Sequence, residues 1–396
     1  MPHSVSSDFL VEIEKRVPLV GRKFTIGTSD YTAFVKRWPK IRKRWNDIRP
    51  INITINLSNE NQAFDFFEDE PYKMQNETKI QFGVPWSVES PAGTDEYINI
   101  HEGKISSVKY TKDSCTLSVV DKIKPFAEKL LGDTDNPLDY TNSDYLPSDL
   151  AWYWATSYGG LDTTKSTANT DIDYDDFSAW ADVFSSSSIL AQAYFEGTRL
   201  NEAFRKLGRI TRSSIYVEDG KLRFARYTET TSITLDLGAN PIIDVHGLID
   251  DKQIINKHIT FADYNVDSDT YSVVVNDEDT TSVNTYGSRE QIEKDQNVWY
   301  VNSASAVDLS QRIVLTQKEP YVQLKAKTTA APITRFIGDL ITFEFDKLGI
   351  GAGDTKRLMG YEFDLQSMSM NIEVDDSQIV GIFRLDQSQL DIDRLA

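Results

Sequence analysis

Residues 51–58 read INITINLS, and this stretch decides the expected fold class. Its apolar side chains Ile51, Ile53, Ile55 and Leu57 alternate with polar ones. A period of two residues places the apolar set on one face of a β-strand. Similar short apolar runs occur at 24–27, 79–86 and 97–100, and a hairpin pattern covers 105–110, 111–114 and 115–120. Many short strands separated by turn residues predict a barrel or a sandwich.

Composition excludes several classes of protein. The chain has 396 residues, with 42 Lys and Arg against 61 Asp and Glu, which gives a net charge of −19. Such a charge argues against general coating of nucleic acid, which needs a positive face. Cys115 is the one cysteine, so an intramolecular disulfide is excluded and a reducing compartment is expected. The sequence shows no targeting segment and no apolar run of the roughly 20 residues that cross a bilayer.

Helical periodicity is clearest at 198–209. Leu200, Ala203, Phe204 and Leu207 form one stripe, and Thr198 suits the N-cap. Further helices are predicted in the aromatic-rich stretches 149–157 and 174–184, and at 303–317. β-patterning resumes in the second half, where residues 361–374 alternate in two halves. Their phase slips at Gln366 and Ser367, which predicts a β-bulge or bend.

These patterns predict a mainly β protein with α insertions (α+β), built from two barrel-like β-domains with a helical insertion. The expected boundaries are 1–122 for the first β-barrel domain, 123–212 for the helical insertion, 213–236 for a returning hairpin of the first β-domain, and 237–396 for the second β-barrel domain with its own helical insertion at about 303–317. No exact repeat is legible between the two β-domains.

Motifs for chemistry are weak. Asp171, Asp173, Asp175 and Asp182 resemble the carboxylate spacing of a calcium loop, but Asp176 stands where the loop needs glycine. A solvated acidic loop is the favoured interpretation, with a cation site as the alternative. The four histidines lack zinc-ligand spacing, and no nucleophile elbow, Walker A loop or dinucleotide fingerprint is present. The glycine-rich residues 349–353 are interpreted as a turn. No cofactor, no metal and no catalytic residue are therefore predicted.

One segment is basic against the overall charge. Residues 22–49 hold nine Lys and Arg and only two Asp, with Trp38 and Trp45 interleaved. The candidate interface residues within it are Lys36, Arg37, Lys40, Arg42, Lys43 and Arg44. They could contact an acidic partner or passing nucleic acid, or simply protect an edge strand from aggregation. Pairing with carboxylates of a neighbouring copy is a third possibility.

Across most of its length the sequence resembles the tail-tip or baseplate hub proteins of tailed bacteriophages, which are related in fold to the hub part of type VI secretion spike proteins. Two stretches carry the resemblance best: residues 195–226, FEGTRLNEAFRKLGRITRSSIYVEDGKLRFAR, and residues 281–291, TSVNTYGSREQ. Residues 23–57, 146–180, 338–345 and 360–374 support it. None of these stretches is a catalytic motif.

The resemblance implies a ring-forming subunit without enzymatic activity. Three copies with two barrels each would present six barrels to the sixfold tail and a threefold face to a central fibre or spike. The implied partners are the chain itself as a homotrimer, a distal tail ring protein, the C-terminal end of the tape-measure protein, and the fibre or spike, with genomic DNA only in passage. The implied location is the virion tail tip, after folding and assembly in the host cytoplasm.

A carbohydrate-binding or carbohydrate-cleaving β-protein of the tail is the alternative. Its support is the 11% aromatic content, because aromatic platforms and carboxylates bind sugars. Core and interface packing explains aromatic residues equally well.

Overall fold

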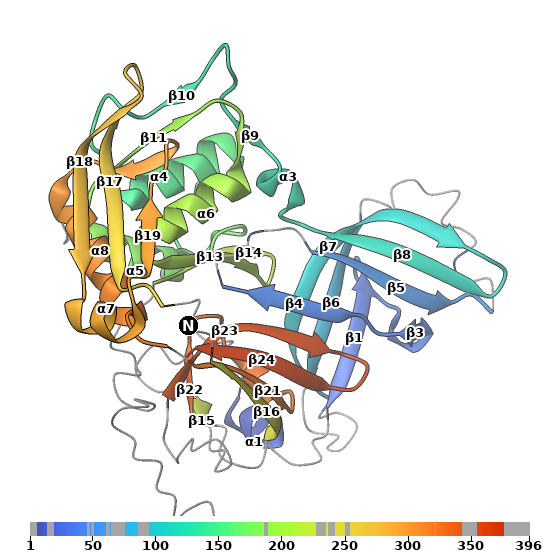
Figure 1. Cartoon of the computed structure of the whole chain (residues 1–396). Coiled ribbons are helices and arrows are strands. Elements are labelled where there is room, and N and C mark those ends of the chain that lie inside the picture. Colours follow the sequence, from blue (N-terminus) through green and yellow to red (C-terminus); the bar gives the residue numbers. More distant parts are fainter. Residues whose placement is uncertain are drawn as a thin grey trace, which may run out of the picture.

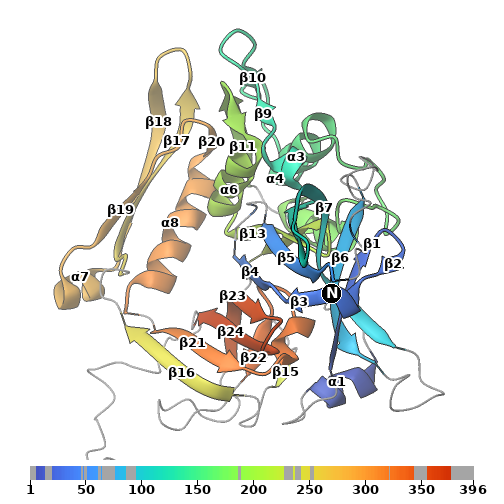
Figure 2. The ribbon, with the colours of Figure 1, turned by 90° about the vertical axis from the view of Figure 1, so that its right-hand side faces the viewer.

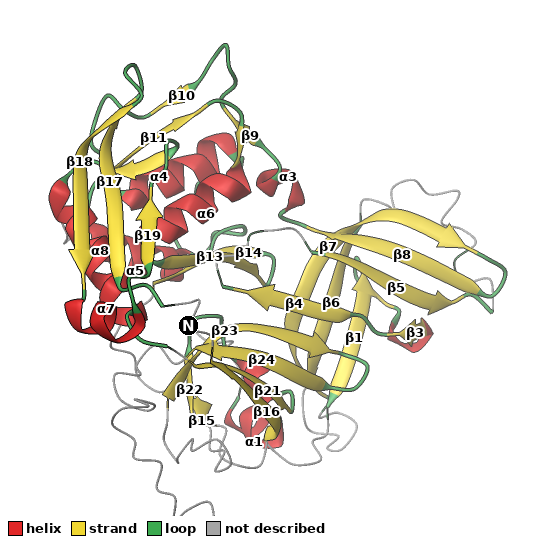
Figure 3. Cartoon of the chain, viewed as in Figure 1, coloured by secondary structure: helices red, strands yellow, loops and turns green. Residues whose placement is uncertain are grey.

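The computed structural model describes residues 6–13, 20–45, 48, 51–60, 64, 76–85, 95–185, 189–226, 235–236, 242–249, 254–320, 322–342 and 355–375. Two seven-stranded sheets lie beside a unit that holds most of the helices (Figure 1). The mainly β architecture with α insertions is therefore confirmed (Figure 3). None of the helices in the described part of the chain is both long and apolar enough to span a bilayer.

The first sheet comes from the N-terminal third of the chain. Its order is β2-β1-β6-β7-β8-β5-β3. The strands are β1 (Gly21–Ile26), β2 (Ser29–Asp30), β3 (Val35–Arg37), β5 (Asn52–Ser58), β6 (Glu77–Val84), β7 (Glu96–Tyr110) and β8 (Ser114–Asp121). β5 confirms the strand predicted from INITINLS, because Ile53, Ile55 and Leu57 are buried. The predicted hairpin is the pair β7–β8, which turns at Thr111–Asp113.

The second sheet has the order β15-β22-β23-β24-β21-β16, and β4 pairs with β23 beside this path. The strands are β4 (Lys40–Arg44), β15 (Leu235–Asp236), β16 (Ile242–Ile249), β21 (Val322–Thr328), β22 (Leu340–Thr342), β23 (Thr355–Asp364) and β24 (Ser369–Asp375). β4 thus carries a segment of the first 122 residues into the second sheet, which the predicted boundaries did not foresee. The predicted turn at 349–353 lies outside the described residues.

The two sheets repeat one topology. Apart from the two-residue strand β2 and the added strand β4, the first sheet has, in chain order, β1, β3, β5, β6, β7 and β8, and the second has β15, β16, β21, β22, β23 and β24. In both, the spatial order is first, fourth, fifth, sixth, third, second. Two bulges match too: β3 and β16 each carry an extra residue against the third strand, and β7 and β23 each carry one against the sixth. A further bulge in β6–β7 has no counterpart in β22–β23. The pairing of the first strand differs, since β1–β6 is antiparallel and β15–β22 is parallel.

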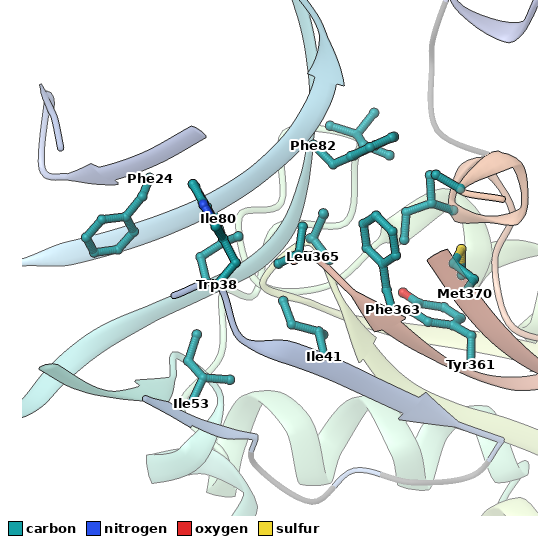
Figure 4. Packing of buried hydrophobic residues seen from close by; sticks show 14 of the residues in the cluster. Phe24, Trp38, Ile41, Ile53, Ile80, Phe82, Tyr361, Phe363, Leu365 and Met370 are labelled. Carbon is teal, nitrogen blue, oxygen red and sulfur yellow. The ribbon is translucent and has the colours of Figure 1, made fainter. Parts of the chain in front are cut away.

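One buried cluster joins the two sheets. Phe24, Ile80 and Phe82 of the first sheet pack with Tyr361 and Phe363 of the second (Figure 4). The rings of Phe82 and Phe363 meet edge to face, with centroids 5.1 Å apart. The short N-terminal helix α1 (Ser7–Ile13) adds Phe9 and Ile13 to this cluster.

The helical unit has a core of its own. Its helices are α3 (Lys124–Ala127), α4 (Pro147–Tyr153), which runs on as a π-helix (Trp154–Tyr158), α5 (Tyr174–Ser185), α6 (Leu200–Ile210), α7 (Thr280–Tyr286) and α8 (Ser303–Gln317). Short 3-10 helices lie elsewhere, at Thr32–Phe34 and Ala331–Thr334. Its strands are β9 (Leu130–Leu131), β10 (Leu138–Asp139), β11 (Ala191–Phe195), β12 (Thr198–Arg199), β13 (Ser213–Glu218), β14 (Lys221–Arg226), β17 (Lys257–Asn265), β18 (Thr270–Glu278), β19 (Glu290–Glu293) and β20 (Val298–Tyr300). β17, β18 and β19 form what we call the third sheet, in the order β18-β17-β19.

Two predictions about domain membership differ from the observed contacts. The hairpin β13–β14 forms as predicted, but among the described strands it pairs only with itself, while α5 and α6 pack on it. Its residues Ile215, Leu222 and Phe224 belong to the core of the helical unit, whereas Tyr216 belongs to the cluster between the two sheets. Residues 257–317, assigned to the second β-domain, also pack there, because Ala262 and Leu309 lie in the same core.

The structure decides two local predictions. The apolar stripe of helix α6 is buried as expected. The N-cap of this helix is Arg199 and not the predicted Thr198, because Thr198 pairs with Leu131 in β12. Of the two alternatives predicted at the phase slip near Gln366, the structure has the bend and not the bulge: β23 ends at Asp364, and a tight turn leads to Ser369. The Asp364 carboxylate accepts the backbone N–H groups of Gln366 and Ser367, which closes the turn.

Candidate subunit interface

β4 divides the basic segment between two faces of the second sheet. Its burial alternates along the strand, so Lys40, Arg42 and Arg44 point outward while Ile41 and Lys43 point into the core. Alternation follows from strand geometry, in which successive side chains project to opposite faces.

The outward cations of β4 are partnered within the chain. The Lys40 ammonium lies 3.4 Å from carboxylate oxygens of both Glu362 and Asp364. Arg42 and Arg44 both reach Glu373, at 3.6 Å and 2.6 Å, and Lys325 reaches the same carboxylate at 3.5 Å. Arg42, Arg44, Lys325, Glu362 and Glu373 line a hollow of about 370 Å³ on the outer face of the sheet. Their charges are therefore largely offset before any partner arrives.

Lys43 is placed differently from the other five candidates. It is buried, and its ammonium lies 3.4 Å from the Glu218 carboxylate at the end of β13. The Tyr361 hydroxyl donates to the same carboxylate at 2.7 Å. Within the single chain the Lys43 charge ties the hairpin to the second sheet, whereas its predicted role at an interface stays a prediction.

β3 carries the remaining two candidates at an edge of the first sheet. Lys36 donates to the Asp113 carbonyl at 2.9 Å and lies 3.6 Å from Glu60. Arg37 is exposed and has no ion pair with any described residue. It lines a second hollow, of about 420 Å³, together with Trp38, Lys40 and Asp364. Among the six candidate residues, Arg37 on β3 is therefore the one that forms no ion pair with a described residue.

The acidic pattern at 171–182 forms no cation-binding loop. Helix α5 begins at Tyr174, so Asp175 and Asp182 lie on a helix. Asp173 and Asp176 hold the buried Arg223 guanidinium at 2.8 Å and 2.7 Å, and the Arg223 guanidinium stacks over Phe336 at 3.9 Å. No cluster of three or more His, Cys, Asp or Glu suited to a metal occurs in the part of the chain that the structure describes.

Two buried histidines are neutral. Burial, with a smaller effect from Lys43, lowers the pKa of His101 to about 3. Burial lowers the pKa of His258 to about 4, and its ring bonds Ser310 on α8 at 3.0 Å. Burial also raises the pKa of Asp121, at the end of β8, to about 6. These groups pack inside the protein, away from any open cleft.

Aromatic residues mostly serve the cores. Trp38, Trp154, Trp180 and Trp299 are buried, and Trp154 packs edge to face on Phe195 and Phe204. Only Trp45 and Trp152 among the described tryptophans are partly exposed. Packing therefore accounts for most of the described tryptophans.

The fold is one that solved phage tail proteins share, which confirms the predicted resemblance at the level of structure. No protein-family model matches the sequence, and no curated protein matches it. A tail protein from Neisseria meningitidis MC58 aligns with TM-score 0.57 and 12% identity, over 90% of this chain and 96% of that one. The 43 kDa tail protein of prophage MuSo2 from Shewanella oneidensis aligns with TM-score 0.51 and 12% identity, over 90% of this chain and 98% of that one. Prophage tail protein gp18 from Listeria monocytogenes EGD-e aligns with TM-score 0.53 and 11% identity, over 90% of this chain and 94% of that one.

Proposed function

We propose that this protein is a structural subunit of a bacteriophage tail, and that three copies form the hub of the tail tip or baseplate. The likeness in fold to prophage tail proteins supports the tail assignment. The observation that carries the hub assignment is the repeated strand order of the two sheets, with its matched bulges.

Repetition matters because of symmetry. Three chains with two similar modules each present six similar surfaces around one axis, while everything outside the modules keeps threefold symmetry. Such a ring adapts a sixfold tail to a threefold fibre or spike. It would close the channel at the end of the tape-measure protein until the DNA is ejected.

This role needs no catalysis, and we propose none. The proposed neighbours are a distal tail ring protein on the six-module face and a central fibre or spike on the other. The proposed location is the virion tail tip, with folding and assembly in the host cytoplasm.

The test measures symmetry directly. Light scattering of the purified protein should give three times the 45.0 kDa mass of the chain. Imaging of intact particles should show three copies around the tail axis, with their β-modules in a ring of six. A different copy number at the tip, or a ring made by one module per chain, would contradict the proposal. Incubation with polysaccharide or peptidoglycan checks the alternative, which requires binding or cleavage.

A further inference from the structure

The third sheet has one face that no described helix or strand covers, although the Lys294 ammonium lies 5.7 Å from the Phe261 ring centroid. α8 packs against its inner face, where His258 and Thr260 bond Ser310. On the outer face, Phe261 lies opposite Val274, and Ile259 lies opposite Ile292. Val274 is 57% exposed and Ile292 55% exposed. These four side chains form an apolar outer patch, and exposed apolar patches mark interaction sites.

The same sheet ends in a long edge strand. β18 is nine residues long, and among the described strands it pairs only with β17. Its sequence TYSVVVNDE contains no proline, lysine or glycine, the residues that commonly block pairing at an edge. The free backbone groups along this edge can take another strand.

Charge indicates which strand would fit. Residues 265–288 contain five carboxylates and no Lys or Arg, so the β18 edge is acidic at both ends. Asp277 and Glu278 at one end form no ion pair with any described residue, although Lys257 lies opposite Glu278 on β17 and interacts with its charge. Asp279, in contrast, is held by Lys318 at 2.9 Å. Residues 31–45 show the opposite bias, with six basic side chains and no acidic one.

Within that basic segment, β3 is the part with available charge and an available edge. It lies at the end of the first sheet, and Arg37 has no described ion-pair partner. β3 and β18 lie at opposite ends of the molecule, so they do not meet within one chain (Figures 1 and 2). A closed ring requires two different, complementary surfaces on each subunit, and these two edges meet that requirement.

We propose that in the ring β18 of one copy lies along β3 of the next. Asp277 and Glu278 then face Lys36 and Arg37, and the neighbouring copy covers the apolar outer patch. This contact rests on the proposed ring of three, and it names the two edges that close it.

Charge reversal tests the contact. Lys36→Glu with Arg37→Glu, or Asp277→Lys with Glu278→Lys, should each weaken self-association by roughly tenfold or more, since like charges then meet. The chain carrying all four reversals should associate like the natural one. Glu128→Lys with Asp144→Lys, exposed acids of the helical unit, is the matched control and should leave association unchanged. Lack of recovery in the four-reversal chain would overturn the proposed pairing.

Cysteine cross-linking separates this contact from the ring itself. The natural Cys115 is buried, so cross-links between chains should form only through the introduced thiols. Under mild oxidation, Arg37→Cys with Glu278→Cys should link chains into covalent trimers, both in solution and in particles. Arg37→Cys with Glu128→Cys should not. A threefold ring without this cross-link overturns the β18–β3 contact and leaves the hub function standing, whereas the absence of any threefold ring removes both.

Discussion

Lys43 shows how strand alternation changes the meaning of a residue. In the sequence it is one of six adjacent cations, yet β4 turns it inward onto Glu218. A buried ion pair contributes little net stability, but a single unpartnered buried charge is costly.

We predict that Lys43→Met destabilises the protein by about 3–5 kcal/mol, because Glu218 then stays buried without its paired ammonium, while the Tyr361 hydroxyl and the nearby Arg223 charge remain. Urea unfolding measures this. Adding Glu218→Leu should recover most of the loss. Arg42→Met on the outward face should cost less than about 1 kcal/mol, since that pair is half exposed. Equal costs for the two single variants would contradict the assignment.

His101 makes stability depend on pH. Burial holds the pKa of this imidazole at about 3 in the folded protein, against about 6.5 when unfolded. Its contribution is therefore complete above pH 6.5 and is lost as the pH falls from 6.5 towards 3, because only the unfolded chain takes up the proton. Asp121 acts in the opposite sense: its raised pKa, about 6, lets the folded protein gain stability as the pH falls through that value.

The two effects separate in a variant. Between pH 8 and pH 5, the unfolding free energy of the natural protein should fall relative to that of His101→Gln by about 2 kcal/mol. Asp121 and His258 are common to both proteins and cancel in the difference. Parallel pH profiles for the two proteins would show that His101 is accessible to protons in the fold.

At the scale of elements, close backbone approach decides where a strand tolerates a side chain. Gly83 in β6 lies against Glu96 and Tyr97 of β7, and a Cβ there would stand 2.0 Å from the Glu96 carbonyl oxygen. Both strands would have to separate to admit it.

We predict that Gly83→Ala costs about 3 kcal/mol or more in thermal or urea unfolding. Gly197→Ala is the matched comparison, because its φ of +89° strains an alanine but nothing lies within 4 Å of the new Cβ. That variant should cost about 1–2 kcal/mol. If Gly83→Ala proved the milder of the two, the tight β6–β7 approach would be wrong.

At the scale of the whole molecule, the two β-modules are joined in two ways. β4 leaves the first module and adds to β23 of the second, and the two sheets bury their apolar faces in one cluster. The hairpin β13–β14 links this pair to the helical unit, since Glu218 bonds Lys43 and Tyr361 while Phe224 packs under α5. The modules therefore hold a defined relative position, which a ring of six modules needs.

Local patterns in the sequence were sufficient to predict where individual strands and helices form. The alternation in INITINLS, the stripe of α6 and the helix at 303–317 all formed where predicted, because periodicity reflects which face a segment buries. The same reasoning left two alternatives open at Gln366 and Ser367, since a phase slip looks alike whether the chain bulges or turns back, and pairing of β23 with β24 showed that it turns back.

What only the tertiary structure decided is which segments pair. The repeated strand order, the passage of β4 into the second sheet and the packing of residues 257–317 on the helical unit all join residues far apart in the chain. The same holds at the candidate interface: the sequence determined that a basic segment exists, but its carboxylate partners Glu218, Glu362 and Glu373 lie 175, 322 and 329 positions away. A local pattern shows the period of an element but not which distant residues lie beside it. That Arg37 on β3 forms no ion pair with a described residue could therefore be seen only from the tertiary structure.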